Sequence, residues 1–382
     1  MSALELLAVS VGGLAACGVI AELLARAVLR SKGGYYCWWP NRKQRFLLDR
    51  ESLPMLPPVV HWQANRDGER GGAPPAAGES CYRVLLAGGS CVEGYYLDQP
   101  ETVAGQLETQ LASESNLAQL QVQRTHVGSI ARSRISCAQI QTLLEKIQPR
   151  YHSLDCLVLM VGASNLVRWL ELSTPKAPWE DGVALSHLFE LHPEGPFGWH
   201  PKRTAIRALV VRAHRRLRPT EEVRNAVGKR ILQQRKRRQE ARVMLDECPD
   251  PTEMIEQFAT ELGGLIEFAK TMAKEVVVVR QPCFDKEMSP DESKWMWNFA
   301  QGVIYGSGVD TYYSHRLVRE LMRKTAERCG EVARERGVID IDLSKDLEPG
   351  LENYYDFLHF TPKGAERVAE QIRKHLLGEA GT

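Results

Sequence analysis

Short apolar runs alternate with segments of helical periodicity from residue 82 to the C-terminus. Two runs, at 155–161 and 275–280, are almost wholly apolar, as parallel strands covered on both faces are. Strands are also expected at 83–88 and 338–343, and a weaker one at 120–127. Apolar residues recur at helical spacing between and after these runs, at 100–112, 137–148, 252–274, 316–337 and 362–377. This alternation predicts an α/β fold, a doubly wound, parallel, five-stranded sheet.

The N-terminus has a different pattern. Residues 6–21 are apolar or small and uncharged, and the aromatic cluster YYCWWP follows at 35–40. A bilayer-spanning helix needs about 20 apolar residues, and aromatic side chains are typical of the membrane–water boundary. No basic residue precedes the run, as one would in a cleaved signal peptide. We predict a single transmembrane helix and membrane anchor within residues 1–40, with a buried soluble helix as the alternative.

The side of the membrane stays open at this stage. Basic residues gather after the apolar run, at Arg26, Arg30, Lys32, Arg42, Lys43 and Arg45. By the positive-inside rule they favour a cytoplasmic domain. An enzyme acting on esters of the cell envelope would need the opposite orientation.

Two further segments lie outside the strand–helix pattern. Residues 41–81 are rich in proline and glycine and predict an extended linker, so the main domain is expected at 82–378. A basic insertion at about 171–250 interrupts that domain. Its basic stretch at 228–242 predicts a solvated helical face. The alternatives are a flap over the site or a contact with anionic lipid headgroups.

Composition excludes several other classes of protein. The chain has 382 residues, and 43% of them are hydrophobic. Its net charge is only +1, and its basic stretch has no interleaved aromatic residues, so we do not expect it to bind nucleic acid. Nine cysteines lack a CxxC pair, and His187, His192 and His200 lack metal-ligand spacing. We therefore expect no metal and no cofactor. Oligomeric state has no signature in the sequence.

Polar residues follow the expected strands at their carboxyl ends, where open α/β sheets bind ligands. They are Ser90 after the first strand, Gly128 with Ala131 after the second, Ser164 and Asn165 after the third, and Asp356 and His359 before the last helix. A histidine can remove the proton of a serine hydroxyl, and an aspartate can hold that histidine in one tautomer. Backbone N–H groups and an amide can stabilise an oxyanion. These residue types predict nucleophilic catalysis.

In these motifs the chain resembles the SGNH hydrolases, also called the GDSL esterase/lipase superfamily. GGS at 88–90 is similar to the nucleophile turn of its Gly-Gly-Ser group, and ANRDGERG at 64–71 resembles a stretch that precedes the core in membrane-anchored bacterial members. The resemblance implies a flavodoxin-like sheet and hydrolysis of acyl esters. It also implies a triad of Ser90, His359 and Asp356 that needs no metal.

The oxyanion hole is less firmly indicated than the triad. The family's Gly-x-Asn-Asp reads Gly162-Ala163-Ser164-Asn165 here, so a gapless match puts Ser164 where the oxyanion asparagine belongs. A shift of one residue would let Asn165 donate instead, and we expect Asn165 to be the stronger donor. A backbone N–H would come from Gly128 or Ala131.

The sequence therefore predicts a membrane-anchored serine esterase acting on short acyl esters, preferably of a carbohydrate. Acyl transfer to a sugar acceptor is a close variant. A non-catalytic SGNH-like domain that binds a glycan or an assembly partner is the alternative from another class. Cys91, next to Ser90, is a weaker candidate nucleophile because its side chain is expected to point away.

Overall fold

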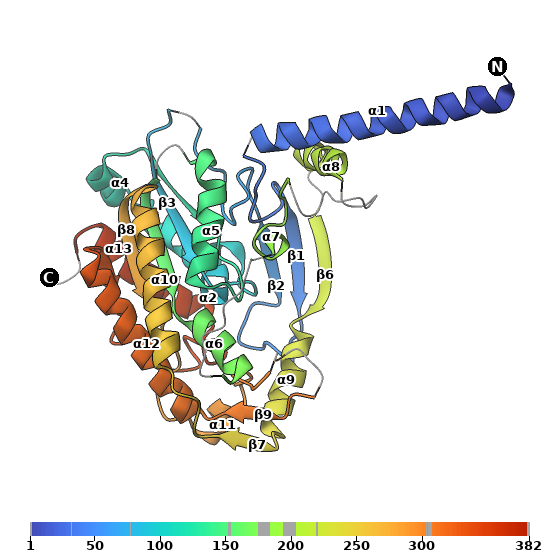
Figure 1. The fold of residues 1–382 in the computed structure, drawn as a ribbon. Helices are drawn as coiled ribbons and strands as arrows, with labels where there is room; N and C mark the ends of the chain where they lie inside the picture. The colour runs from blue at the N-terminus through green and yellow to red at the C-terminus, as the bar shows by residue number, and fades with distance from the viewer. Residues whose placement is uncertain are drawn as a thin grey trace.

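A five-stranded parallel sheet forms the centre of the protein within the part of the chain that the structure describes (Figure 1). The computed structural model describes all residues except 1, 32, 77, 152–153, 175–183, 194–203, 219–220, 303, 305–307 and 380–382. The strand order is β10-β8-β5-β3-β4, with bounds β3 (Cys81–Gly88), β4 (Arg124–Ser129), β5 (Leu154–Val161), β8 (Ala273–Arg280) and β10 (Ile339–Ile341). Read along the chain this is the flavodoxin-like order, which confirms the predicted fold class.

Helices cover both faces of this sheet. On one face α10 (Thr252–Lys270) packs against α5 (Cys137–Ile147) and α12 (His315–Glu335), and on the other α3 (Val103–Leu111) packs against α13 (Pro362–Leu376). The central strands are buried almost throughout, and Leu157 of β5 lies between Leu85 of β3 and Val276 of β8. Burial on both faces explains why these strands read as continuous apolar runs.

The prediction of a linker over residues 41–81 is wrong for residues 43–63. There β1 (Lys43–Leu48) and β2 (Val59–Gln63) form an antiparallel pair, and β6 (Glu221–Val227) adds in parallel to β1. Alternate side chains of β1 and β2, among them Phe46 and Trp62, are buried in the main hydrophobic core. A strand that contributes half of its side chains to a core is part of the domain.

The basic insertion is folded onto the domain where the structure describes it. It contains α7 (Leu185–Leu188), α8 (Ala205–Leu217), β6, α9 (Lys229–Gln239) and β7 (Val243–Leu245), the last paired with β9 (Thr311–Tyr313). The predicted solvated face is wrong for Arg235 and Arg238 of α9, which are buried, whereas Arg230 and Lys236 are exposed. The two buried arginines have backbone carbonyl partners that the sequence pattern does not reveal.

The N-terminal helix α1 (Ala3–Ser31) projects from the rest of the chain (Figure 1). It is long and apolar enough to cross a membrane, and its most apolar window buries nothing within the protein. Near its C-terminal end Ala25 and Leu29 pack with α8 residues Ala205 and Ala208. The remaining helices are short: α2 (Ser90–Glu93), α4 (Glu114–Leu120), α6 (Ala163–Leu172) and α11 (Pro290–Ser293).

Candidate active site

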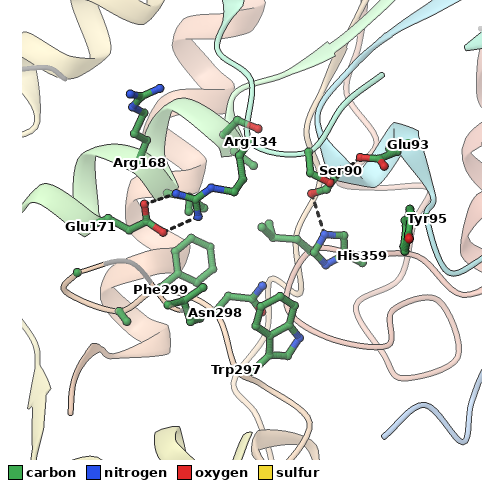
Figure 2. A pocket seen from close by; sticks show the side chains of 18 of the residues that line it. Ser90, Glu93, Tyr95, Arg134, Arg168, Glu171, Trp297, Asn298, Phe299 and His359 are labelled. Carbon is green, nitrogen blue, oxygen red and sulfur yellow. Dashed lines mark hydrogen bonds and ion pairs between the residues drawn. The ribbon is translucent and has the colours of Figure 1, made fainter. Parts of the chain in front are cut away.

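Ser90, His359 and Asp356 form a continuous hydrogen-bonded chain, and Figure 2 shows its first link, from Ser90 to His359. The Nε2 atom of His359 lies 2.8 Å from the Ser90 hydroxyl oxygen, and its Nδ1 atom lies 2.8 Å from Oδ2 of Asp356. The serine and histidine are separated by 269 positions in the sequence. The fold thus brings together the three residues that the sequence analysis singled out as candidate nucleophile, base and orienting carboxylate.

Ser90 is presented by a tight turn between β3 and α2. A Cβ atom at Gly88 would stand 2.5 Å from the Met160 carbonyl oxygen, so only glycine allows β3 to approach β5 this closely. Ser90 is the first residue of α2, and the helix ends at Gly94 with a φ of 55°. The first N–H groups of a helix have no intrahelical acceptor, so the N–H of Ser90 is free of helical bonding.

Asp356 is fully buried and is held by several donors. It accepts the backbone N–H groups of Leu358 and His359 at 2.8 and 2.9 Å, and the indole Nε1–H of Trp297 at 2.8 Å. This loop leads into α13, whose start at Pro362 after the Thr361 cap matches the sequence prediction. A carboxylate with this many donors keeps its charge although it is buried.

The charges of the pair are set by their mutual contact. Burial alone would raise the pKa of Asp356 and lower that of His359, because it penalises the charged form of each. The attraction between them outweighs burial, so the pKa of Asp356 lies below its ordinary value and the pKa of His359 lies above it. An imidazole of raised basicity accepts a proton from a hydroxyl more readily.

Of the two candidate side-chain donors, the structure places Ser164 in the cleft beside Ser90. Its hydroxyl oxygen lies 2.7 Å from where a Cβ would stand at Gly89, the residue before the nucleophile. Asn165 instead directs its amide towards α10, where it donates to Glu261 at 3.1 Å. The expectation that Asn165 is the donor is therefore wrong. Successive residues of a helix point about 100° apart, so Asn165 faces away from the cleft when Ser164 faces into it.

The structure does not bring Gly128 to the site either. It lies within β4 opposite Leu85, five positions before Ser90 in the paired strand. A Cβ at Gly128 would stand 2.5 Å from a carboxylate oxygen of Glu69, so this glycine makes room for a buried side chain. The N–H of Ala131 donates to the Ser129 hydroxyl at 3.3 Å. Neither residue lines the cleft.

Ser90 and His359 open into a cleft of about 1000 Å³. Aromatic side chains form much of its wall, namely Tyr95, Tyr96, Trp297, Phe299 and Tyr355. Polar groups line the cleft as well (Figure 2). The Ser133 hydroxyl donates to the Glu93 carboxylate at 2.5 Å, and Arg134 forms a bidentate ion pair with Glu171 at 2.6 Å. Burial raises the pKa of Glu93. The cleft can hold a molecule larger than an acyl group alone.

Arg70, from the ANRDGERG stretch, is hydrogen-bonded to the segment that follows Ser90. It is buried and donates to the carbonyl oxygens of Gly94 and Leu97, each at 2.7 Å, and to that of Glu93. These carbonyls belong to the end of α2 and the loop that follows. Three charged hydrogen bonds on one short loop fix the helix that carries Ser90.

The two buried arginines of α9 support the opposite wall. Arg238 donates to the carbonyl oxygens of Asn298 and Tyr313, both at 2.7 Å. Arg235 donates to the carbonyl oxygens of Trp295, at 3.1 Å, and of Ser52. The insertion thus anchors the loop that carries Trp297. The sequence analysis missed Trp297 and both arginines, because no local motif marks a partner 60 positions away.

The other candidates contribute no alternative chemistry in the described part of the chain. His187 lines the cleft and His192 is buried, whereas His200 lies outside the described residues. No group of three histidine, cysteine or acidic residues that could hold a metal occurs among the residues described. Cys91 points away from the cleft, 3.3 Å from the Leu358 carbonyl oxygen, and burial raises its pKa.

Comparison with known proteins gives structural relatives only. No family model and no curated protein sequence matches the chain. A lipase/acylhydrolase from Enterococcus faecalis aligns at 14% identity and a TM-score of 0.39, covering 78% of this chain and 95% of its own.

Two further structures align over similar lengths. A GDSL-like lipase from Parabacteroides merdae has 11% identity, a TM-score of 0.39, and coverage of 80% and 100%. The acetylxylan esterase Axe2 from Geobacillus stearothermophilus has 11% identity, a TM-score of 0.41, and coverage of 78% and 95%. The chain is similar to these three structures at low identity, and its function is argued below from its own site.

Proposed function

We propose that this protein is a serine esterase of the SGNH type. The observation that carries the proposal is the 2.8 Å contact between the Ser90 hydroxyl and His359 Nε2, with Asp356 bound to the other ring nitrogen. This arrangement has the geometry that nucleophilic acyl transfer requires. The position of Ser90 at the carboxyl edge of the sheet, opening into a large cleft, gives an ester access to it.

The reaction follows from the contacts. Ser90 Oγ attacks the ester carbonyl carbon as its proton passes to His359 Nε2, and Asp356 stabilises the imidazolium that forms. His359 then gives this proton to the leaving alcohol oxygen, which leaves the acyl group on Ser90. A water molecule attacks the acyl carbon and transfers a proton to His359 Nε2. The proton returns to Ser90 as the carboxylic acid departs.

The negative oxygen of each tetrahedral intermediate needs fixed donors. The candidate donors are the Ser90 N–H at the start of α2 and the Ser164 hydroxyl at the start of α6, both of which belong to residues that line the cleft. A donor aimed at the developing charge is typically worth a factor of about 100 to 1000 in turnover. We assign the oxyanion hole to these two groups.

The substrate class is inferred from the cleft. Its aromatic walls offer flat surfaces on which sugar rings stack, and its volume of about 1000 Å³ exceeds what a short acyl group needs. We infer a short acyl ester of a carbohydrate. Analysis of the released acyl group with and without an added sugar acceptor separates hydrolysis from acyl transfer.

We also propose that α1 anchors the enzyme in a membrane. The helix is long enough to span a bilayer, and its apolar side chains are exposed along most of its length. A bilayer would cover these side chains, which water solvates poorly.

Labelling with a fluorophosphonate tests the esterase proposal without knowledge of the substrate. The wild-type chain is expected to form one covalent adduct on Ser90, and Ser90→Ala to form none. His359→Ala is expected to lose nearly all labelling, because an unassisted serine hydroxyl is almost never ionised at neutral pH.

Ser289→Ala provides the matched control. Ser289 caps the exposed helix α11, away from the cleft, so this variant is expected to label like wild type. An adduct mapped to Cys91, or a folded wild-type protein that takes up no probe, would contradict the proposal and favour a binding domain.

A further inference from the structure

The helix α8 is bound to α1 through the partly exposed carboxylate of Glu22. Glu22 of α1 accepts the backbone N–H of Ala205 at 2.8 Å and that of Ile206 at 3.1 Å, and it also pairs with Arg26 at 3.1 Å. The two N–H groups belong to the first turn of α8 and have no acceptor within the helix. Glu22 thus attaches the N-terminus of α8 to α1.

Small apolar residues complete this contact. Ala25 and Leu29 of α1 pack with Ala205 and Ala208 of α8, and all four are buried. Figure 1 shows that α1 extends beyond this crossing, away from the rest of the molecule, towards the N-terminus. The contact therefore separates an exposed apolar part of α1 from a part that is packed on the protein.

The crossing lies where a bilayer would end. With a rise of 1.5 Å per residue, the helix from Glu5 to Glu22 is about 25 Å long, close to the roughly 30 Å hydrocarbon thickness of a membrane. Given the proposed anchor, on which this step rests, the hydrocarbon boundary falls at Glu22. The helix α8 then lies at the level of the lipid headgroups.

The outer surface of α8 has the composition of an interfacial helix. Ile206, Val210 and Leu217 lie on one side of the helix at spacings of four and seven, and they are 38%, 61% and 80% exposed. Residues 204–218 include five arginines and one histidine and no acidic residue. Exposed apolar residues beside cations on one helix are typical of binding at an anionic membrane surface.

Arg212 and Arg215 of α8 are engaged with residues outside the helix. Arg212 lies over the Tyr36 ring, and Arg215 pairs with Glu222 at 2.7 Å. Arg216 and Arg218, near the C-terminal end of the helix, are exposed. The charge that faces outward therefore lies close to the exposed side chain of Leu217.

We propose that α8 is an interfacial helix that binds anionic phospholipid headgroups. Its stripe of Ile206, Val210 and Leu217 inserts at the boundary between headgroups and acyl chains, and Arg216 and Arg218 contact lipid phosphates. Together with α1 it forms a two-point attachment that fixes the orientation of the catalytic domain relative to the membrane.

The test uses the full chain with a single engineered cysteine that carries an NBD fluorophore. Val210→Cys reports on the stripe, and Glu253→Cys, at an exposed position of α10, is the control. Both are made in a Cys17→Ser background, which also supplies the labelling blank. The proteins are reconstituted in nanodiscs of phosphatidylcholine with or without phosphatidylglycerol. Dithionite reduction is expected to be about tenfold slower at position 210 than at position 253 when anionic lipid is present, because the probe is then buried in the interface.

Charge reversal tests the headgroup contact. Arg216→Glu with Arg218→Glu is expected to remove most of the protection at position 210. Arg230→Glu with Lys236→Glu, on the exposed side of α9, changes the charge equally and is expected to leave that protection unchanged. Equal reduction rates at 210 and 253, or equal effects of the two charge reversals, would overturn the proposal. Protection at 210 in detergent that grows with protein concentration would also overturn it and indicate a second copy of the chain as the occupant.

A label on native Cys17 separates this proposal from the anchor itself. Cys17 is exposed within the apolar part of α1. A protected Cys17 label with an accessible label at 210 would leave the anchor standing and refute the interfacial helix. Free access at both positions would refute the anchor.

Discussion

The indole Nε1 of Trp297 donates a hydrogen bond of 2.8 Å to Oδ2 of Asp356, the same oxygen that lies 2.8 Å from His359 Nδ1. The Trp297 ring is also parallel to the His359 ring, with an interplanar angle of 4°. The Trp297 side chain thus has two effects. Its hydrogen bond draws charge density from the Asp356 carboxylate, and its ring limits the tilt of the His359 imidazole. We propose that Trp297 is a positioning residue for the Asp356–His359 pair.

Trp297→Phe is expected to lower kcat/KM by about 10- to 100-fold, since a hydrogen bond to a charged group contributes about 1.5–3 kcal/mol. Without the indole donor the Asp356 charge acts more strongly on His359, so the acid limb of the pH–rate profile is expected to move to higher pH. Trp295→Phe, two positions earlier in the same loop, serves as the control. An unshifted profile for Trp297→Phe would show that the indole acts only through packing.

Ser164→Ala is expected to slow ester hydrolysis by about 100-fold, the lower end for loss of an oxyanion donor. Asn165→Ala removes the amide contact with Glu261 and is expected to cost about 1 kcal/mol of stability with little change in turnover. Steady-state kinetics and urea denaturation of both variants check this ranking. A larger loss of kcat for Asn165→Ala would restore the original sequence prediction.

Asp356→Asn is expected to reduce kcat by about 10,000-fold, because the amide favours the wrong imidazole tautomer. The carboxylate raises the pKa of His359 above its ordinary value, so its removal lowers that pKa. The neutral, basic form of His359 then persists to lower pH, and the acid limb of the residual activity is expected to shift downward. A pH–rate profile measured on fluorophosphonate labelling rates reports this shift directly.

Arg238→Met is expected to reduce the free energy of unfolding by about 3 kcal/mol, because two buried carbonyls lose a charged donor. Arg230→Met on the exposed side of the same helix is expected to change it by less than about 0.5 kcal/mol. Urea unfolding compares the two variants. Equal effects would mean that α9 contributes through helix propensity rather than through its buried arginine.

The buried pair of Glu69 and His126 predicts a loss of stability in alkali. Burial alone would lower the pKa of His126, but its contacts with Glu108 and Glu69 raise it to about 9. A raised histidine pKa stabilises the fold fully below the unfolded value of about 6.5, and this contribution is lost as pH rises through about 9. The unfolding free energy is expected to fall over this range in wild type, with a smaller slope in His126→Gln.

Local sequence determined the sheet and the contact between Asp356 and His359. Apolar runs such as 155–161 specify buried parallel strands by themselves, and β5 is found at Leu154–Val161. Asp356 and His359 are three positions apart in one turn, so their contact follows from the chain's local geometry. Ser90 reaches them because the turn after β3 and the loop before α13 both lie at the carboxyl edge of the same sheet.

The oxyanion donor depended on details that a sequence pattern leaves open. Gly162 has a φ of 123°, and the angle at this turn decides whether Ser164 or Asn165 faces the cleft. Gly128 falls within β4 rather than at its end, because the strand extends to Ser129. A shift of one residue is invisible to a motif and rotates a helical side chain by about 100°.

Only the tertiary structure decided the contacts made across long separations. β1 pairs with the nearby β2, and β6, encoded about 180 positions later, adds to its other edge. The basic stretch of α9 reads as a solvated surface, yet Arg235 and Arg238 are buried because carbonyl groups of distant loops meet them there. A buried cation needs partners that local sequence does not supply, so its position is fixed by the packing of the whole chain.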